Sequence, residues 1–340
     1  MEIISVNNRL IHPLHEDVEF LDAEILENEE AYSGQISREH FLGANTKSIY
    51  YSRLRNKCII PVFAKDNEST ISHAEFISAL HETASHVFSR EQILEPAIRV
   101  SHPIKGRVPE AMGKPANLLS EAEKTLYYER MAFVIEVPSI HDDIAGNKLS
   151  LTVGGVRAYN LENLNSRKSE EKFKIFIGFN NWVCCNLCIS TDGFSSEIRA
   201  RSPHEIVEQS YKLFTEFNAH QTLKEMNELT QYALSEPMFA QMVGRARMYP
   251  HLPAKMKKEI HPLELGDSQI NLVVKDYYKD ESFCRDKNGD IDLWRLYNLF
   301  TSANKNSYVD TFLDRNVSVY SFTRRILESF KNRQEFWYIN

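Results

Sequence analysis

The chain has 340 residues, of which 42% are hydrophobic and 26% charged, and this composition excludes wholesale disorder. No run approaches the roughly 18 consecutive apolar residues of a membrane span, and the first five residues lack the basic start of a secretory signal. We therefore expect a cytoplasmic protein with no membrane partner. Its five cysteines, an odd number, suit the reducing conditions of that compartment.

The net charge of −7 comes from the start of the chain. Residues 1–40 hold ten acidic and two basic side chains, whereas the other 300 residues hold 37 acidic and 38 basic ones. We therefore interpret residues 1–37 as an acidic N-terminal arm, either partly disordered or helical when docked. Residues 38–340 are interpreted as a single globular domain, whose neutral charge neither predicts nor excludes a local basic surface.

The domain is predicted to start with a strand and a helix. Residues 58–64 form a short apolar run that predicts a buried strand, and Pro61 within it indicates an edge or a bulge. Ser72 and Glu75 have the spacing of a capping box, in which each side chain binds a free backbone N–H group of the other residue. Apolar residues then recur at helical spacing as far as Phe88, so the sequence predicts a helix here.

The next segment is predicted to be a connection followed by a second helix. Residues 98–117 contain several prolines and glycines, which indicates an extended, irregular connection. Ser120 and Glu123 form a second capping-box pattern, which predicts a helix that ends near residue 130.

Short runs rich in Val, Ile, Phe and Tyr predict a β-rich core over residues 131–200. Turn residues such as Gly146, Asn181 and Gly193 separate these runs. Because connections this short cannot contain a crossover helix, neighbouring strands should be antiparallel, and we expect a β-meander of about five strands. The predicted strands are residues 131–137, 149–161, 172–180, 182–190 and 194–200.

After residue 200 the pattern becomes helical. Ser202 is a good N-cap residue, Pro203 suits the first helical position, and Glu205 places an acidic residue in the first turn. The predicted fold class is therefore α+β, with a central antiparallel β-meander and a helical C-terminal half, residues 201–340, packed on it. The predicted helices are residues 203–233, 236–248, 268–280, 292–303 and 308–331.

Three cysteines near the end of the β-rich core suggest a metal cluster at first sight: Cys184, Cys185 and Cys188. In a strand, however, Cys184 and Cys188 would be about 13 Å apart at roughly 3.3 Å per residue, whereas two thiolates on one zinc ion lie within about 4 Å. Cys185 would also face the opposite side of the strand. We therefore interpret the three as small apolar residues of the core.

Two acidic segments contain other possible metal ligands. His141-Asp142-Asp143 has ligand residue types, but it follows a strand and leads into a turn, so we interpret it as a solvated loop. Residues 286–292 alternate oxygen-bearing side chains like a calcium loop, but the glycine and the twelfth residue do not fit that motif. A polar turn that ends in the N-cap of the next helix explains this segment equally well.

The sequence contains no phosphate-binding loop, nucleophile elbow or zinc-protease motif. We therefore predict no catalytic residues, no metal ligands and no cofactor, and favour a non-enzymatic protein. A metal-dependent enzyme that the sequence does not reveal is kept as an alternative.

Basic residues form the remaining candidate site, because contact with nucleic acid requires accessible cations. Lys172 and Lys174 share one face of a predicted strand by the period of two, and aromatic residues such as Trp182 could stack on bases. The alternative interpretation is that these are solvated surface charges and core aromatics. The candidates are Arg99, Lys105, Arg107, Arg157, Lys172, Lys174, Arg245 and Arg247.

Several blocks of the sequence resemble one known family. They include residues 99–111 (RVSHPIKGRVPEA), 127–133 (YYERMAF), 154–160 (GGVRAYN), 176–179 (FIGF), 191–193 (TDG), 296–301 (LYNLFT) and 312–315 (FLDR). From about residue 40 to its end the chain resembles the family of the domain of unknown function DUF3871, and more distantly the phage- and plasmid-borne family DUF932. The resemblance implies a protein of mobile genetic elements or prophages and transfers no activity. It leaves the acidic arm outside the match.

The resemblance leads to our functional hypothesis, a non-enzymatic accessory protein of a mobile element that binds or anneals single-stranded DNA. The hypothesis predicts that Lys105→Ala/Arg107→Ala weakens binding equally across sequences. The alternative is a protein–protein inhibitor of a host defence system, of the anti-restriction type, with the acidic arm as its interaction element. The oligomeric state is left open.

Overall fold

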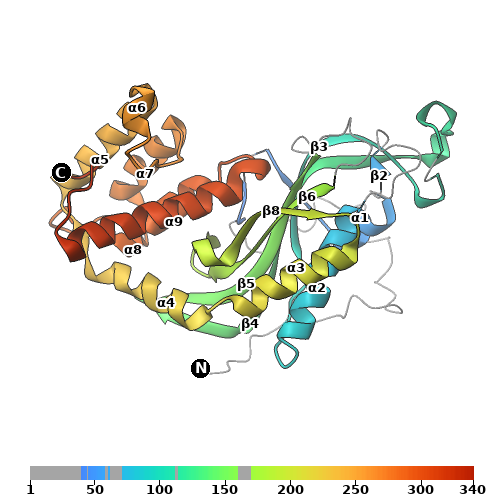
Figure 1. Ribbon diagram of the computed structural model, residues 1–340, viewed down its shortest axis with the longest axis horizontal. Coiled ribbons are helices and arrows are strands. Elements are labelled where there is room, and N and C mark those ends of the chain that lie inside the picture. Colours follow the sequence, from blue (N-terminus) through green and yellow to red (C-terminus); the bar gives the residue numbers. More distant parts are fainter. Residues whose placement is uncertain (1–39, 44, 58–59, 62–70, 112–113, 160–169) are drawn as a thin grey trace.

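The computed structural model describes residues 40–43, 45–57, 60–61, 71–111, 114–159 and 170–340 (Figure 1). Within these residues the strands of the main sheet are β1 (Lys47–Ile49), β2 (Ile60–Pro61), β3 (Ala97–Arg107), β4 (Lys124–Ile144), β5 (Asn147–Ala158), β6 (Glu171–Asn181), β7 (Asn186–Cys188) and β8 (Phe194–Ala200). All neighbouring strands are antiparallel, in the order β1-β3-β4-β5-β6-β7, with β2 also paired to β3 and β8 to β6. The predicted meander is therefore confirmed.

Helices flank this sheet and make up most of the C-terminal half (Figure 1). They are α1 (Tyr51–Lys57), α2 (His73–Val87), α3 (Pro203–Glu216), α4 (Ala219–Glu228), α5 (Glu236–Met248), α6 (Ala254–Lys257), α7 (Asp267–Lys279), α8 (Leu293–Asn304) and α9 (Val309–Asn332). A second, two-stranded sheet joins β9 (Ala233–Leu234) to β10 (Ile291–Asp292). The α+β fold class is confirmed.

Local sequence signals were correct where a cap or a tight turn decides the structure. Ser72 and Glu75 form the predicted capping box at the start of α2. Ala145 and Gly146, between β4 and β5, have φ angles of 53° and 80°. Two successive residues with positive φ match the twist of a two-residue hairpin, so the turn was predicted correctly.

The predicted connection at residues 98–117 and the helix after Ser120 were wrong. Most of the connection is the long strand β3, and β4 pairs with it along the whole of β3. The capping box does form, since the backbone N–H of Ser120 donates to Glu123 over 2.7 Å, but only one 3₁₀ turn follows it. Tyr127 and Tyr128 then lie buried in the sheet. Strand pairing and aromatic burial outweigh the local helix signal.

Two other predicted elements are divided in the structure. Of the strand predicted at 182–190, only the three residues of β7 remain, because residues 182–185 form a turn held by a 3.0 Å hydrogen bond from the Val183 N–H to the Asn181 side chain. The helix predicted at 203–233 is split into α3 and α4, with Asn218 as the N-cap of α4. An internal N-cap signal was therefore missed.

The two acidic segments have different outcomes. His141, Asp142 and Asp143 lie on the last part of β4, paired with β5 beyond a bulge, so the predicted loop was wrong, although both aspartates are exposed to solvent as expected. In the segment 286–292, the Asp286 side chain accepts the backbone N–H groups of Asn288 and Asp290. Asp292 caps α8, which confirms the prediction of a polar turn.

The acidic arm, residues 1–37, lies outside the described residues, as does most of the strand predicted at 58–64. Of that strand, β2 is described, and it pairs with the end of β3.

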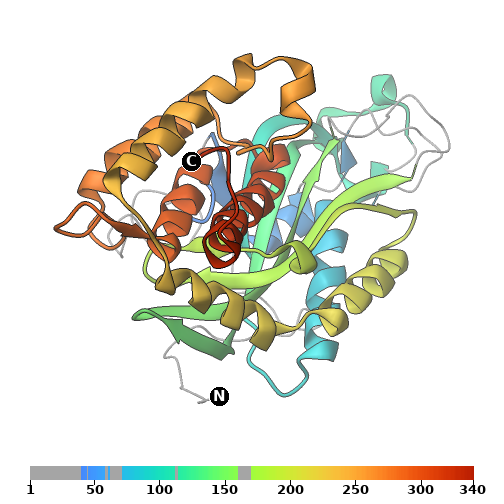
Figure 2. The same ribbon diagram turned by 60° about the vertical axis from the view of Figure 1, so that its left-hand side comes forward.

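One face of the sheet packs against α2 and α3 (Figure 2). The Phe76 ring on α2 lies 5.2 Å from the ring of Phe133 and 4.7 Å from the ring of Phe173, between centroids. Gly155 on β5 lies directly below, and a Cβ atom there would meet the Phe76 ring. The glycine is therefore required for the close approach of helix and sheet.

The other face packs against the first turns of α9. Phe312 and Leu313 on this helix form a buried cluster with Ala132, Val134 and Val156 of the sheet. Because apolar side chains cover both faces at its centre, the sheet is an internal layer of the fold.

Buried amide side chains fasten the β6–β7 hairpin to α8 and α9. Asn181 donates to the Asn298 side chain over 3.0 Å, and Asn186 donates to the Asn298 carbonyl over 3.0 Å. Asn316 on α9 donates to the Leu187 carbonyl over 2.9 Å. These bonds satisfy polar groups that burial would otherwise make costly, and they fix the position of the C-terminal helices against the sheet.

Candidate functional site

The eight basic candidates do not lie together. Arg99, Arg107 and Arg157 are buried, Lys105 is exposed on β3, Lys172 and Lys174 lie on β6, and Arg245 and Arg247 lie on α5. They therefore serve different roles, which their contacts define.

Arg157 is a fully buried structural residue. Its guanidinium lies 4.3 Å from the ring centroid of Tyr159 and 4.8 Å from that of Phe173. It forms an ion pair with Glu171 and donates a hydrogen bond to the Ile71 carbonyl. The side chain therefore joins β5, β6 and the start of α2, and the burial keeps it from any phosphate.

Arg99 and Arg107 hold neighbouring chain segments in the same way. Arg99 donates to the Thr46 carbonyl over 2.8 Å and to the Ser48 hydroxyl over 2.7 Å, which ties β1 to β3. Burial lowers the pKa of Arg99 from its usual value. Arg107 donates a hydrogen bond to the Lys114 carbonyl and so ties the end of β3 to the segment that follows it.

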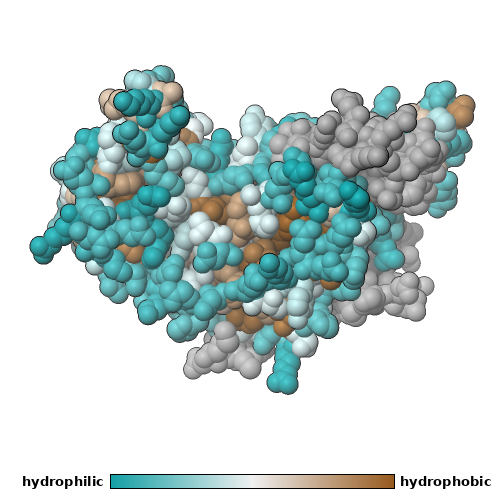
Figure 3. Space-filling model, in the orientation of Figure 1, coloured by the Kyte–Doolittle hydropathy of each residue, from teal (hydrophilic) through white to brown (hydrophobic). Residues whose placement is uncertain are grey.

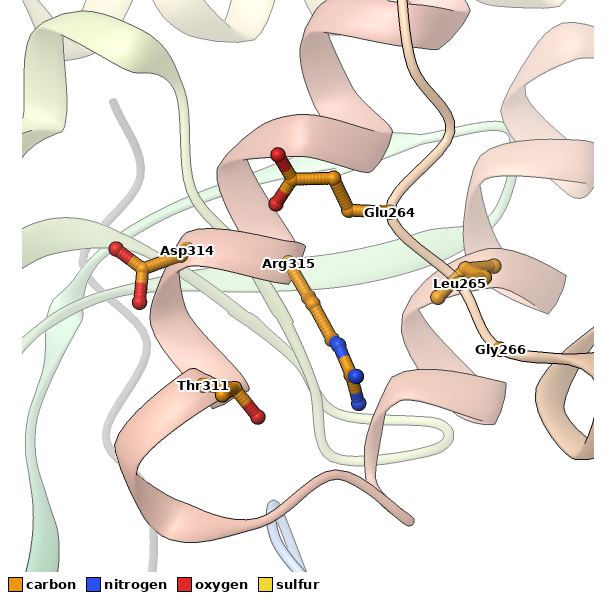
Figure 4. Close-up of a pocket in the computed structure, with 6 residues that line it drawn as sticks. All are labelled: Glu264, Leu265, Gly266, Thr311, Asp314 and Arg315. Atoms are coloured by element: carbon orange, nitrogen blue, oxygen red, sulfur yellow. The ribbon is translucent and has the colours of Figure 1, made fainter. Parts of the chain in front are cut away.

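Lys172 and Lys174 line a surface groove beside α9, which we call the α9 groove. It consists of two hollows that share Asp314. The sheet-side hollow, of about 320 Å³, is lined by Val156, Ala158, Lys172, Phe173, Lys174, Ser196, Glu197 and Asp314. The outer hollow, of about 370 Å³, is lined by Glu264, Leu265, Gly266, Thr311, Asp314 and Arg315 (Figure 4). Hydrophobic side chains show at the surface beside α9 and β8 (Figure 3).

The charged groups of the sheet-side hollow are paired with one another. Lys174 binds the carboxylate of Asp314, and Lys172 lies 3.5 Å from the carboxylate of Glu197. The pKa of Glu197 lies below its usual value, mainly because Arg199 donates hydrogen bonds to it. Both lysines line this hollow, as does Phe173 between them, so the hollow does not test the prediction that they share a face of the strand.

The outer hollow is different, because its charged ends point in different directions (Figure 4). Arg315 donates to the Ser307 hydroxyl over 3.0 Å, and the carboxylates of Glu264 and Asp314 point away from the guanidinium. The six residues of this hollow include neither histidine nor cysteine. The groove as a whole balances three cations with three carboxylates, so it can bind a ligand through ion pairs but attracts no net charge.

A second surface carries a marked excess of positive charge. We call residues 245–259, which comprise the end of α5, α6 and the turn between them, the basic tip. It holds five Lys or Arg side chains and one Glu in a chain whose net charge is −7. α6 stands at the outer end of the C-terminal helices, away from the sheet (Figure 1). Met248 and Met256 are 58% and 44% exposed there.

The cations of the basic tip fall into two groups. Arg245 donates to the Trp337 carbonyl, and Arg247 binds the Asn271 side chain, so both predicted residues hold the tip against other segments. Lys255 and Lys258 are exposed, and their ammonium groups make no hydrogen bond or ion pair with any residue that the structure describes. These two lysines are therefore the most accessible cations of the tip.

His73 is a buried polar residue of the sheet half, the name we give to the main sheet β1–β8 together with α1, α2 and α3. Its ring stacks on Tyr127 with 4.7 Å between centroids, and its Nε2 atom lies 2.7 Å from the Tyr128 carbonyl oxygen. Burial, with a smaller effect of the Arg157 charge, lowers the pKa of His73 to about 3. The ring is therefore neutral at physiological pH.

The prediction that the three cysteines are core residues holds for Cys188, while Cys184 packs against the core partly buried. Cys184 and Cys185 lie in the turn before β7 and not in a strand, whereas Cys188 is buried at the end of β7. Burial raises the pKa of the Cys188 thiol well above its usual value. Among the described residues, no group of three or more His, Cys, Asp or Glu side chains is arranged to hold a metal ion.

Sequence reasoning missed most residues of both surfaces. Asp314 and Arg315 were part of a block that resembles the family, but nothing in their spacing indicated a groove. Lys255 and Lys258 follow Arg245 and Arg247 within a short segment, and counting charge in a 15-residue window would have found them.

Comparison with known proteins identifies one family. The model of the family described as "Domain of unknown function, B. Theta Gene description (DUF3871)" matches residues 20–339. The match starts earlier than expected, so residues 20–37 of the acidic arm lie inside it and their exclusion was wrong. No curated protein and no solved structure matches the chain.

No helix in the described part of the chain has the length and apolar character needed to cross a membrane.

Proposed function

The chain belongs to the DUF3871 family, which brings no activity with it, and we propose that it is a non-enzymatic accessory protein that binds single-stranded nucleic acid through the basic tip. Association with mobile genetic elements, which the sequence resemblance implied, forms part of this proposal. The nucleic acid would then be single-stranded DNA of such an element.

The observation that carries the proposal is the concentration of charge on the basic tip. Five cations and one carboxylate lie within fifteen residues, and Lys255 and Lys258 are exposed. Each phosphate that a lysine neutralises releases condensed counterions, and this release favours binding. The α9 groove, by contrast, balances its cations with carboxylates, so a polyphosphate gains no net attraction there.

Exposed methionines favour a single strand over a duplex. Met248 and Met256 lie beside the cations and are largely accessible. A thioether packs favourably on aromatic rings, and nucleobases present their ring faces only when they are not stacked in a duplex. The tip thus combines phosphate contacts with an apolar surface for bases.

The test uses a labelled single-stranded oligonucleotide and the full chain. Fluorescence anisotropy should show binding at about 50 mM salt that weakens steeply as salt is added. Lys255→Ala/Lys258→Ala should weaken binding by about one to two orders of magnitude at low salt. It should also lower the slope of log K against log salt by about 1.4, the value for two lost phosphate contacts on a single strand.

The matched control is Lys212→Ala/Lys224→Ala, which removes two exposed lysines from α3 and α4. This variant has the same net charge as the tip variant and should bind nearly as well as the unchanged chain. The proposal is rejected if the oligonucleotide does not bind at about 50 mM salt, or if both variants lose affinity equally.

The double variant Lys105→Ala/Arg107→Ala does not separate a loss of nucleic-acid binding from a loss of folding. Lys105 is exposed, but Arg107 is buried and donates to the Lys114 carbonyl, so its loss should disturb the fold. Lys105→Ala alone should have a small effect on binding, because this residue lies on β3 and outside the basic tip.

Exposed leucines favour a protein partner as a second candidate function. Leu118 and Leu126 are 60% and 53% exposed on the segment that joins β3 to β4 and on the start of β4. An inhibitor that acts on a host defence protein would use such apolar side chains. In a pull-down with nuclease present, Leu118→Asp/Leu126→Asp should lose the partner, whereas the tip variant should keep it. Deletion of residues 1–37 tests the acidic arm in the same assay.

A further inference from the structure

The outer hollow of the α9 groove is an open surface hollow lined mostly by polar residues, and it lies outside the basic tip. Its volume of about 370 Å³ falls at the lower end of the roughly 300–1,000 Å³ that small-molecule sites occupy. One wall comes from α9 and the other from the chain just before α7 (Figure 4). Leu265 adds a buried apolar side chain to the second wall.

Arg315 presents a guanidinium that is fixed but not neutralised within the described part of the chain. The Ser307 hydroxyl accepts one of its hydrogen bonds over 3.0 Å and so orients the side chain. The neighbouring residue Asp314 also lines the hollow, but its carboxylate points away from the Arg315 guanidinium and binds Lys174 (Figure 4). An oriented guanidinium with spare donors is suited to bind a carboxylate through two parallel hydrogen bonds.

Glu264 supplies the opposite charge on the other wall of the hollow. Its carboxylate points away from the Arg315 guanidinium, and the residues that the structure describes give it no cationic partner (Figure 4). Thr311 donates its hydroxyl proton to the Tyr308 carbonyl over 3.3 Å and keeps its oxygen as an acceptor. The hollow thus offers the Arg315 guanidinium as a donor for an anion, and the Glu264 carboxylate and Thr311 hydroxyl as acceptors for a cation.

We propose that the outer hollow binds a small zwitterion, an amino acid or a short peptide, with the ligand carboxylate on Arg315 and the ligand ammonium on Glu264. A ligand with only a negative charge would be repelled by Glu264. A ligand with only a positive charge would be repelled by Arg315. Only a molecule that carries both charges satisfies both walls.

The test measures binding of free amino acids and dipeptides to the full chain by isothermal titration calorimetry. Three forms of each ligand separate the contributions: the free form, the N-acetylated form without the ammonium, and the amide form without the carboxylate. The free form should bind best, by roughly tenfold over each blocked form. Dipeptides that bind more tightly than free amino acids would identify a peptide end as the ligand, and the reverse would identify a free amino acid.

Two variants assign the ends of the ligand. Glu264→Gln should weaken binding of the free form by about tenfold, whereas the N-acetylated form, which Glu264 repels, should bind somewhat better. Arg315→Lys keeps the charge but loses the two-pronged donor, so it should weaken every ligand that has a carboxylate. Glu259→Gln, at an exposed glutamate of the basic tip, is the control and should change nothing.

The proposal is overturned if no amino acid or dipeptide binds in a saturable manner. It is also overturned if Glu264→Gln binds the free form as well as the unchanged chain does. Because Glu264 is exposed, its substitution should leave the fold intact. Lys255→Ala/Lys258→Ala should bind the zwitterion normally, so this result is independent of nucleic-acid binding.

Discussion

The sheet half and the basic tip use the same kind of residue in opposite ways. In the sheet half, Arg157 lies between two aromatic rings, bound to Glu171 and to the Ile71 carbonyl. In the basic tip, Lys255 and Lys258 extend from the protein surface. The positive charge of the first residue is used by the fold, whereas that of the other two is available to a partner.

The comparison shows that a basic residue indicates a binding surface only when its partners are known. Removing one member of a buried ion pair costs about 3–5 kcal/mol, because the other charge is left buried without its partner. An exposed lysine contributes little to stability, so its charge is available for binding. Substitutions in the two regions should therefore differ widely in their effect on stability.

Removing the buried guanidinium should have the largest effect. Arg157→Ala leaves Glu171 and the Ile71 carbonyl without this donor and opens a cavity between Tyr159 and Phe173. We expect the free energy of unfolding to fall by about 3–5 kcal/mol, as measured by urea denaturation.

Arg199→Ala is the control for this variant, because Arg199 is exposed and pairs with the exposed Glu197. It should cost less than about 1 kcal/mol. Equal losses for the two arginines would show that burial does not separate their roles.

The buried histidine should make the sheet half sensitive to acid. The pKa of His73 is about 3 in the folded chain and 6.5 as its ordinary value, so protonation favours the unfolded state. Stability from this group is full above pH 6.5 and is lost as the pH falls toward 3. The loss should reach about 2 kcal/mol by about pH 5, at about 1.4 kcal/mol per pH unit.

His73→Gln should remove this part of the pH dependence, which urea denaturation at several pH values measures. His204→Gln, at an exposed residue of α3, should keep the slope of the unchanged chain. A slope that His73→Gln leaves unaltered would contradict the assignment to this residue.

Alanine substitutions at Gly155 on β5 and Gly244 on α5 compare how tightly the protein is packed in the sheet and in the C-terminal helices. Gly155→Ala places a methyl group against the Phe76 ring and the Lys174 carbonyl, and should cost about 1–3 kcal/mol. Gly244 on α5 has open space around it, so Gly244→Ala should instead stabilise the protein by about 0.5–1 kcal/mol. Thermal unfolding should show opposite shifts of Tm, and shifts in the same direction would refute the contrast.

The tip variant should have the smallest effect on stability. Lys255→Ala/Lys258→Ala removes two exposed side chains, so the free energy of unfolding should change by less than about 0.5 kcal/mol. A larger loss, measured by urea denaturation, would mean that these lysines support the fold and are not free to bind.

The sequence was sufficient to predict elements that local signals determine. The capping box at Ser72, the N-cap and proline at Ser202 and Pro203, and the hairpin turn at Gly146 are all observed. Each depends on residues that are neighbours along the chain. Their physical cause can therefore be read without knowing the fold.

The sequence was misleading where distant segments decide the structure. The capping box at Ser120 forms, but pairing of β4 with β3 ends the helix after one turn. The sequence shows Arg157 and Lys255 alike as basic residues. Only the folded structure shows that Arg157 lies between the rings of Tyr159 and Phe173 and has a structural role. The α9 groove joins residues more than 100 positions apart, so no local pattern indicates it.

The division of roles is tested most directly by photo-crosslinking a bromouracil-substituted single strand to the full chain, with mass spectrometry of the peptides. We predict that crosslinks concentrate in peptides from residues 245–259 and disappear in Lys255→Ala/Lys258→Ala. Crosslinks that concentrate instead in peptides containing Lys105 or Lys172, or a strand that forms none, would contradict the account.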